Sequence, residues 1–322
     1  MKIYRRALTA ILSLALVSAA FAGCASGGGA SETEQSSASA ATADEAAAPQ
    51  GLAELGIDPR TVDVFPQILH DEAHVPGFQL EPPADGDTIA VVHTSEGDLT
   101  LRFFPDQAPK AVTNFITLAE NGSYNGTTFH KVLPGKLIQG GHCGTDASAP
   151  NGVSAYGGAF EDEFCDSLCN LRGAVSLANT GKDSNGSRFF INCTTAEQFA
   201  ADGGWSAYDE MWANTKAQLS NYKSSNLLPA YLEENGDRCI NTAIIPAAVK
   251  KLYEDNGGNP SFDGAYNAAD RGNTVFAQVI DGMDTVDKIA AVKTDDKDVP
   301  VKSIAVKSIE IKTYSGKAAA KK

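Results

Sequence analysis

The sequence is poor in basic residues. Its 322 residues include 26 Lys and Arg against 40 Asp and Glu, which gives a formal net charge of −14. A surface of that sign repels nucleic acid, whose recognition requires Lys and Arg at the phosphates. Behind the N-terminal leader the only basic cluster is a short tail at 315–322, and such an end is usually solvated. We therefore expect no nucleic-acid partner.

Cysteine is scarce, and its spacing excludes a zinc site of the usual kind. Cys165 and Cys169 have a spacing that could ligate zinc, but no second ligand pair with suitable spacing follows. We expect neither a metal site nor a cofactor. Behind residue 24 the number of cysteines is odd, so they cannot all pair within one chain. Disulfides, packing and free thiols stay open for Cys143, Cys165, Cys169, Cys193 and Cys239.

Long apolar runs are lacking except at the N-terminus. Residues 7–22 form one such run behind a short basic start. It is too short and wrongly flanked for a stable spanning helix, so we interpret residues 1–23 as an export signal. Ala22 and Gly23 before Cys24 resemble a bacterial lipobox, which predicts cleavage there and a lipid on the Cys24 thiol. The alternative is an ordinary secretory signal that contains a cysteine.

The lipidated form predicts an exported protein anchored at the outer face of the cytoplasmic membrane. Residues 24–50 are mostly Ser, Ala, Gly and Glu without an apolar period. Such a segment cannot bury enough surface to offset chain entropy, so we expect a flexible tether. An N-terminal extension at 51–87 then leads to the first clear strand pattern. The membrane is thus an expected partner, through the lipid on Cys24.

From residue 88 to 314 the sequence alternates short strands with turns. Two helices interrupt them, at 108–122 and 281–292; Pro109 stands near the start of the first. Strands are predicted at 88–95, 99–104, 127–133, 173–180, 187–193, 274–280 and 301–314. Many short strands with few helices favour a mainly β fold, a closed antiparallel barrel capped by the two helices.

One region, at about 195–259, departs from this alternation of short strands and turns. Apolar residues recur there at helical spacing, and Pro246 and Gly257 mark the start and end of one helix. The region is too long for a passive loop, so we expect a helical insertion that packs on the barrel. Trp205 and Trp212 are interpreted as core residues of this insertion.

Four segments in the same order resemble cyclophilin-type peptidyl-prolyl isomerases. They are "GDLTLRFFPDQAPKAVTNFITLAENGSYNGTTFHKVLPGKLIQGG", "YGGAFEDEF", "RGAVSLANTGKDSNGSRFFI" and "TVFAQVIDGMDTVDKI". The resemblance covers about 88–314 apart from the insertion. It implies a closed eight-stranded antiparallel barrel with a helix at each end. It also implies catalysed rotation about X–Pro bonds, with proline-containing polypeptides as partners and a monomeric chain.

The resemblance also implies the residues of the site. The family's catalytic arginine falls on Lys131, whereas Gln139, Asn179 and Phe190 match the family's residues. The remaining contact positions fall on Lys136, Leu137, Ala178, Thr180, Arg188, Ser261, Phe262 and Asn273. No bond is made or broken in this reaction, so the resemblance implies no nucleophile, metal or cofactor.

Several of these positions depart from the family's pattern. Lys131 keeps the positive charge but loses the planar fork of a guanidinium, which can donate two parallel hydrogen bonds. Lys136 replaces an aromatic wall, and its charge must reach solvent. Ser261 and Asn273 make the pocket less apolar. Arg188 either supplies the lost guanidinium or bridges to a surface acid.

Three functions are consistent with this pattern. The first is a prolyl isomerase that assists the folding of exported proteins. The second is a weak or inactive cyclophilin-like module that binds extended or proline-containing peptides. In the third, the helical insertion binds a partner and the barrel serves as its scaffold.

Overall fold

The computed structural model describes residues 68–144, 150–222 and 226–316. The predicted signal peptide, Cys24, the tether and the first part of the extension lie outside the described residues, as does most of the basic tail. In the described part no helix has the length and apolar character needed to cross a membrane.

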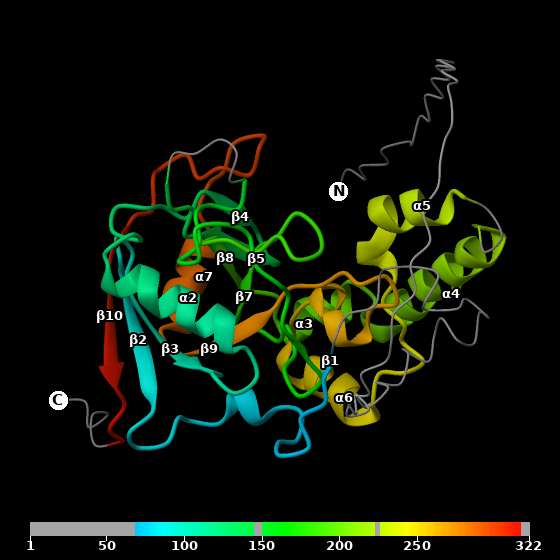
Figure 1. The fold of residues 1–322 in the computed structure, drawn as a ribbon, viewed down its shortest axis with the longest axis horizontal. Coiled ribbons are helices and arrows are strands. Elements are labelled where there is room, and N and C mark those ends of the chain that lie inside the picture. The colour runs from blue at the N-terminus through cyan, green and yellow to red at the C-terminus, as the bar shows by residue number, and fades with distance from the viewer. Residues whose placement is uncertain (1–67, 145–149, 223–225, 317–322) are drawn as a thin grey trace, which may run out of the picture. The chain divides into compact units, whose positions relative to one another are not determined.

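Eight antiparallel strands form one sheet in the order β10-β2-β3-β9-β7-β8-β5-β4 (Figure 1). Their bounds are β2 (Thr88–Thr94), β3 (Asp98–Phe103), β4 (Lys131–Leu133), β5 (Leu137–Gly140), β7 (Ala174–Leu177), β8 (Phe189–Asn192), β9 (Val275–Asp281) and β10 (Val306–Thr313). The β4–β5 connection turns at Gly135, whose φ of 71° favours glycine.

The sheet is curled but not closed, so the prediction of a closed barrel is wrong. Strands β4 and β10 are its two edges. Between these edges the chain forms an isolated bridge, Thr128 with Ala305, and single backbone bonds such as Phe129 N to Ile304 O. The reason is local: β4 has three residues and β10 begins at Val306, five residues later than predicted, so too little regular strand remains to pair.

Two helices cover the curled sheet, α2 (Pro109–Glu120) and α7 (Met283–Ala290). Helix α2 turns Phe115 into the core, where its ring lies 5.1 Å from Tyr124, 5.3 Å from Phe276 and 5.5 Å from Phe189. Phe115 and Phe189 are both almost fully buried. Burial of such rings supplies a large share of core stability, because each removes an extensive apolar area from water.

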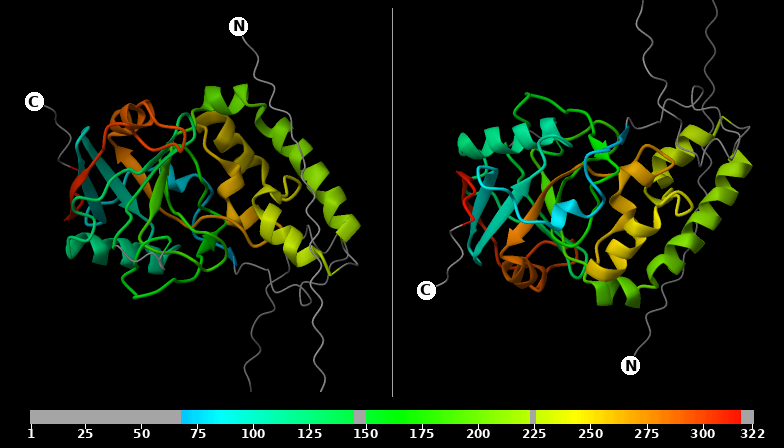
Figure 2. Two further views of the ribbon diagram at one scale, coloured as in Figure 1. Left: turned by 90° about the horizontal axis from the view of Figure 1, so that it is seen from above. Right: turned by 90° about the horizontal axis from the view of Figure 1, so that it is seen from below.

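Within its described residues, the segment predicted to be helical contains four α-helices (Figure 2). They are α3 (Ala196–Ala201), α4 (Gly204–Tyr222), α5 (Leu228–Asn235) and α6 (Ala247–Asn256), with short 3-10 turns at η3 (Gly236–Arg238), η4 (Pro260–Phe262) and η5 (Gly264–Tyr266). Trp212 is buried in a cluster with Leu219 and Leu232, as expected. Trp205 is partly buried and stacks edge-on against Phe199 and Tyr253.

Polar side chains connect this insertion to the sheet. The Asn259 amide donates to Asn192 Oδ1 at 2.8 Å and to the Lys136 carbonyl at 3.2 Å. Asp263 is buried and accepts from the Asn170 backbone at 2.7 Å. Burial raises the pKa of Asp263 to about 6, against the hydrogen bonds that lower it. The insertion is thus tied to the strands by satisfied buried polar groups.

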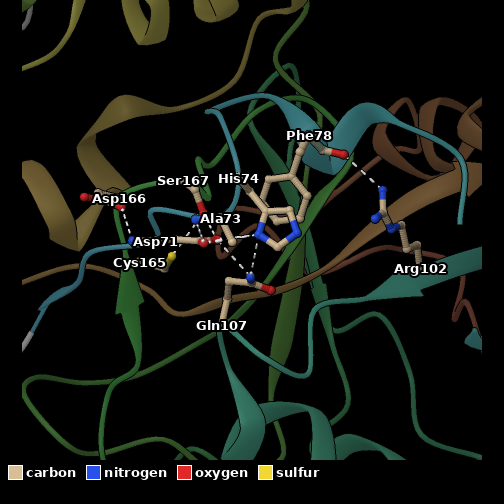
Figure 3. Close-up of polar contacts among 9 residues, drawn as sticks. All are labelled: Asp71, Ala73, His74, Phe78, Arg102, Gln107, Cys165, Asp166 and Ser167. Atoms are coloured by element: carbon tan, nitrogen blue, oxygen red, sulfur yellow. Dashed lines mark hydrogen bonds and ion pairs between the residues drawn. The ribbon is translucent and has the colours of Figure 1, made fainter.

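The described part of the N-terminal extension is fastened to the domain at Asp71 (Figure 3). Strand β1 (Ile68–Leu69) pairs in parallel with β6 (Phe164–Cys165). Asp71 then accepts from Ser167 Oγ at 2.8 Å, from Gln107 Nε2 at 2.9 Å and from His74 Nδ1 at 2.9 Å. Burial raises the pKa of Asp71, but these hydrogen bonds outweigh it and hold the pKa below its ordinary value.

A second contact fastens the extension further along, at η2 (Phe78–Leu80). The Arg102 guanidinium lies 5.7 Å from the Phe78 ring centroid and donates to the Phe78 carbonyl at 3.0 Å (Figure 3). The His74 ring stacks on the Phe78 ring, and the two ring centroids are 4.3 Å apart. A cation over a ring adds roughly 0.5–1 kcal/mol at an exposed site. The described extension therefore behaves as part of the domain.

The five cysteines of the described part are free thiols, and all five are buried. Burial raises the pKa of Cys193 and of Cys239 to about 12 in each case. Such thiols stay protonated near neutral pH and pack as small apolar groups.

Candidate active site

The register of three strands places the central site residues on one face. Lys131 on β4 opposes Gln139 on β5, and Gln139 opposes Phe190 on β8. Directly opposite residues point to the same face of a sheet. Their chain neighbours Val132 and Ile138 are fully buried in the main core. The face that carries Lys131, Gln139 and Phe190 is therefore the outer one.

An apolar cluster separate from the main core lies on this face. Leu137, Ala178 and Phe190 form its buried part, and Leu133 and Phe262 pack against it. The Phe262 ring stands edge-on to Phe190 at 5.1 Å. We call these five residues the Phe190 cluster. It brings together four of the predicted contact residues, from β5, the end of β7, β8 and η4, and its partly exposed members Leu133 and Phe262 are what it presents at the surface.

Lys136 borders the Phe190 cluster. Its Nζ lies 5.4 Å from the centroid of the Phe262 ring, while the residue itself is exposed. The Lys136 carbonyl accepts from the Cys193 backbone at 2.8 Å and from Asn259. The ammonium thus contacts an aromatic face and stays in water, which resolves the expected conflict between its charge and an apolar site.

Gln139 is held by a histidine that the sequence analysis did not select. The Gln139 amide nitrogen lies 3.2 Å from Nε2 of His130. Burial, with a smaller effect of the Arg188 charge, lowers the pKa of His130 to about 4. The imidazole is neutral at pH 7, so its Nε2 accepts a hydrogen bond from the Gln139 amide. That bond directs the Gln139 carbonyl oxygen away from His130, where it can accept from a bound backbone.

Arg188 stands two residues before Phe190 and therefore on the same face. Its Nε donates to His142 Nδ1 at 3.0 Å, and the His142 ring lies edge-on to His130 at 6.3 Å. Within the described residues Arg188 has no carboxylate partner. The surface ion pair considered for Arg188 is absent there, and the Arg188 charge acts on His130.

A signal for the two histidines exists in the sequence. His130 and His142 flank the segment that folds into β4 and β5. Antiparallel pairing of a hairpin brings its two ends together, so residues just outside both strands become neighbours. Gly141 assists this arrangement: its φ is 73°, and a Cβ there would lie 2.6 Å from the Phe189 ring.

Asn179 and Thr180 make their side-chain hydrogen bonds away from the Phe190 cluster. The Asn179 amide donates to the Gly272 carbonyl at 2.8 Å and to Asp162 Oδ1 at 3.1 Å. Thr180 Oγ1 accepts from Asn151 at 3.2 Å. Both side chains shape the loop that follows β7, and what this edge presents to a peptide is backbone.

Ser261 and Asn273 also have partners within the chain. Ser261 Oγ lies 3.4 Å from the Tyr208 hydroxyl of α4, which brings the helical insertion to the border of the Phe190 cluster. The Asn273 amide donates to the Leu177 carbonyl at 2.9 Å, and its backbone nitrogen donates to the Phe262 carbonyl. Both residues support Phe262 and β7 more than they line an apolar surface.

The described ranges contain no group of three or more His, Cys, Asp and Glu side chains that could bind a metal ion. The site combines an apolar surface, an oriented amide and cations. Such groups can bind a peptide and change the charge distribution of its carbonyl without forming a covalent bond.

Comparisons with known proteins agree with this arrangement. The family model described as "Cyclophilin type peptidyl-prolyl cis-trans isomerase/CLD" matches residues 89–211 and 258–311. A protein of Staphylococcus saprophyticus is 36% identical over 239 residues, which cover 72% of this chain and 96% of the relative. One of Staphylococcus haemolyticus is 35% identical over 232 residues, covering 70% and 92%. Both are named "Putative peptidyl-prolyl cis-trans isomerase".

Solved structures include a cyclophilin-type isomerase of Cryptosporidium parvum, with 24% identity and a TM-score of 0.45 over 71% of this chain and 99% of that one. A second structure of that protein, in the presence of the dipeptide Ala-Pro, gives the same identity and TM-score. The gap between the two matched ranges contains the end of α4 and all of α5 and α6, so most of the insertion, but not α3 or the start of α4, lies outside the matched ranges. The chain belongs to the family of cyclophilin-type peptidyl-prolyl cis-trans isomerases.

Proposed function

We propose that this isomerase acts on X–Pro bonds of exported polypeptides and assists their folding at the outer face of the cytoplasmic membrane. Uncatalysed rotation about such a bond takes tens to hundreds of seconds, which is slow enough to limit folding. An isomerase held beside the membrane would meet chains as they emerge from export. The predicted lipid on Cys24 and the tether at 24–50 support this location.

The observation that carries the activity is the single outer face that joins the Phe190 cluster with Gln139, Lys131 and Arg188. In the planar amide, conjugation produces a barrier of about 18–20 kcal/mol. Rotation removes the conjugation and changes the charge on the carbonyl oxygen and the imide nitrogen. A site lowers the barrier when it binds this twisted form more tightly than either planar form.

Each residue of the face has a distinct part in that binding. The Phe190 cluster holds the proline ring by apolar contact. Gln139, oriented by His130, accepts from the peptide backbone. Lys131 and Arg188 provide the cations for the twisted amide, and Arg188 offers the planar guanidinium that Lys131 lacks.

A proline tetrapeptide assay tests the activity directly. We expect the purified chain to accelerate cis–trans exchange, measured by protease-coupled absorbance and by NMR exchange without protease. A rate equal to the uncatalysed one under both methods would contradict the catalytic proposal. The matched control is Phe190→Ala with its folding verified, because this change removes the surface that holds the ring.

A second candidate is a module that binds proline-containing peptides without accelerating rotation. The specific observation in its favour is Lys136, whose charge stands over Phe262 at 5.4 Å in place of an aromatic wall. Binding by NMR titration with an unchanged exchange rate would support this function. The two candidates are therefore separated by one sample measured in two ways.

A further inference from the structure

Three cations of the site lie without acidic partners. Within the described residues Lys131, Lys136 and Arg188 form no ion pair, although the chain carries an excess of acids. Elsewhere Lys110, Lys182 and Lys288 each have a carboxylate oxygen within 2.9 Å. These three charges thus stand without ion pairs on an acidic protein, and they are available to a ligand.

The cations are distributed along the site. In the pairing of β5 with β8, Leu137 opposes Asn192 and Gly140 opposes Phe189. Lys136 precedes the first pair and Arg188 lies beyond the second, so they stand at opposite ends of this strand pair. Arg188 is level with position 141, five residues from Lys136, so at about 3.3 Å per residue the separation is roughly 16 Å along the strands. Phe190 lies between these two ends.

This spacing fits a short extended peptide. Lys136 Nζ lies 5.4 Å from the Phe262 ring, and that ring lies 5.1 Å from Phe190. Each residue of an extended chain spans about 3.5 Å. A carboxylate one or two residues away from a proline on Phe190 therefore comes within reach of Lys136 or Arg188.

We propose that the site selects X–Pro segments with an acidic residue within two positions of the proline, and that Lys136 and Arg188 determine this preference. The proposal rests on the proposed function, because it names the substrate class of the same site. Complementary charge at the border of a binding site favours matching ligands and penalises ligands of like charge. The rest of the surface is acidic and repels an acidic peptide that would bind away from this site.

The test uses three peptide series that differ in one residue within two positions of the proline, which is Glu, Ala or Lys. NMR exchange gives kcat/KM, and NMR titration gives the Kd. We expect the Glu series to exceed the Lys series by about five- to tenfold in both quantities, which corresponds to one or two exposed ion pairs. The ratio should fall towards one in high salt, because exposed pairs are screened.

The decisive variant is Lys136→Glu, with Lys307→Glu as the matched control of net charge. Lys307 is exposed on β10 and is not among the predicted contact residues. Lys136→Glu should bring the preference for the Glu series over the Lys series to nothing or reverse it, whereas Lys307→Glu should leave that preference unchanged. Equal values for the three series, or a ratio that Lys136→Glu does not alter, would overturn the proposal.

The same data separate this proposal from the proposed function. If no series is accelerated but the Glu series binds more tightly, the catalytic proposal fails and the charge preference stands. If all series are accelerated equally, the activity stands and the preference fails. Arg188→Gln combined with Lys136→Gln gives a further check, because removal of both charges should eliminate any remaining preference.

Discussion

Gln139 donates its amide to Nε2 of His130 across 3.2 Å, and this bond depends on a histidine that carries no charge. A protonated imidazole has a donor at both nitrogens and cannot accept from Gln139. The low pKa of His130 is therefore part of how the site is built. It follows from burial first and from the Arg188 charge second.

Acid should disrupt this arrangement before it unfolds the whole chain. The pKa of His130 falls from 6.5 to about 4 on folding, so the unfolded chain binds its proton more tightly. The contribution of neutral His130 to the free energy of unfolding is fully present above pH 6.5, and it is lost as the pH falls towards 4. The pKa of His142 is also lowered by burial and acts in the same direction, whereas Asp263, with a raised pKa, acts oppositely.

NMR titration of the His130 ring checks this prediction, together with kcat/KM between pH 4 and pH 8. We expect activity to fall as the ring becomes protonated. His130→Asn should remove that acid limb while lowering activity at pH 7. A ring that titrates near 6.5 would contradict the prediction.

Replacement of Lys131 by Arg should raise activity. A guanidinium supplies a second parallel donor on the same side of the site, and one more charged hydrogen bond contributes about 1.5 kcal/mol. We therefore expect kcat/KM to increase roughly tenfold, since 1.36 kcal/mol corresponds to a factor of ten. The control is Lys307→Arg, which should change nothing. An unchanged rate for Lys131→Arg would show that Lys131 is not in the role assigned to it.

Arg188 should contribute to rotation itself as well as to binding. Arg188→Gln removes the guanidinium, and we expect kcat to fall about tenfold or more. His142→Ala releases the guanidinium from its 3.0 Å bond and should produce a smaller fall in kcat with little change in KM. Steady-state kinetics on one tetrapeptide measures both. If Arg188→Gln raises KM alone, its role is limited to binding.

Asp71 should stabilise the fold at a distance from the site. Asp71→Ala leaves the donors of Ser167 and Gln107 without their acceptor, at a cost of about 1–3 kcal/mol in the free energy of unfolding. Urea denaturation measures this cost, and the exposed Asp106→Ala is the matched control. Because the pKa of Asp71 is lowered, its contribution is present above pH 3.8 and is lost below. An Asp71 variant as stable as the control would contradict this role.

Cys24 should determine where the protein is found. With Cys24→Ala the predicted lipid cannot be attached, so we expect the protein to leave the membrane fraction while its isomerase rate is unchanged. Mass spectrometry of the N-terminal peptide of the unaltered protein should show the added diacylglycerol mass on Cys24. Recovery of both forms in the same soluble fraction would favour the ordinary secretory signal.

Much of the fold could be predicted because its signals are local. Strand patterns predicted β2, β3, β4, β7, β8, β9 and β10 but missed β5 and β6, and Pro109 marked the start of α2 where the structure has it. The family motifs then identified Gln139, Phe190 and Leu137, which the structure places together. Curvature and closure of the sheet are not local: they depend on whether β4 and β10 can pair, and β4 has only three residues while β10 begins only at Val306.

The sequence by itself determined most of the strands, the two helices that cover the sheet and the family, because hydrophobic period and turn residues act between neighbours in the chain. The order of the strands and the face that carries the site came only with the fold. Only the tertiary structure decided the state of that site. It placed Lys136 over Phe262 and Arg188 beside His142, contacts between residues distant in sequence. It also partly buried His130, which lowers the pKa of that ring to about 4. Such contacts and the desolvation that goes with them exist only once the chain has folded, since both depend on what surrounds a side chain in space.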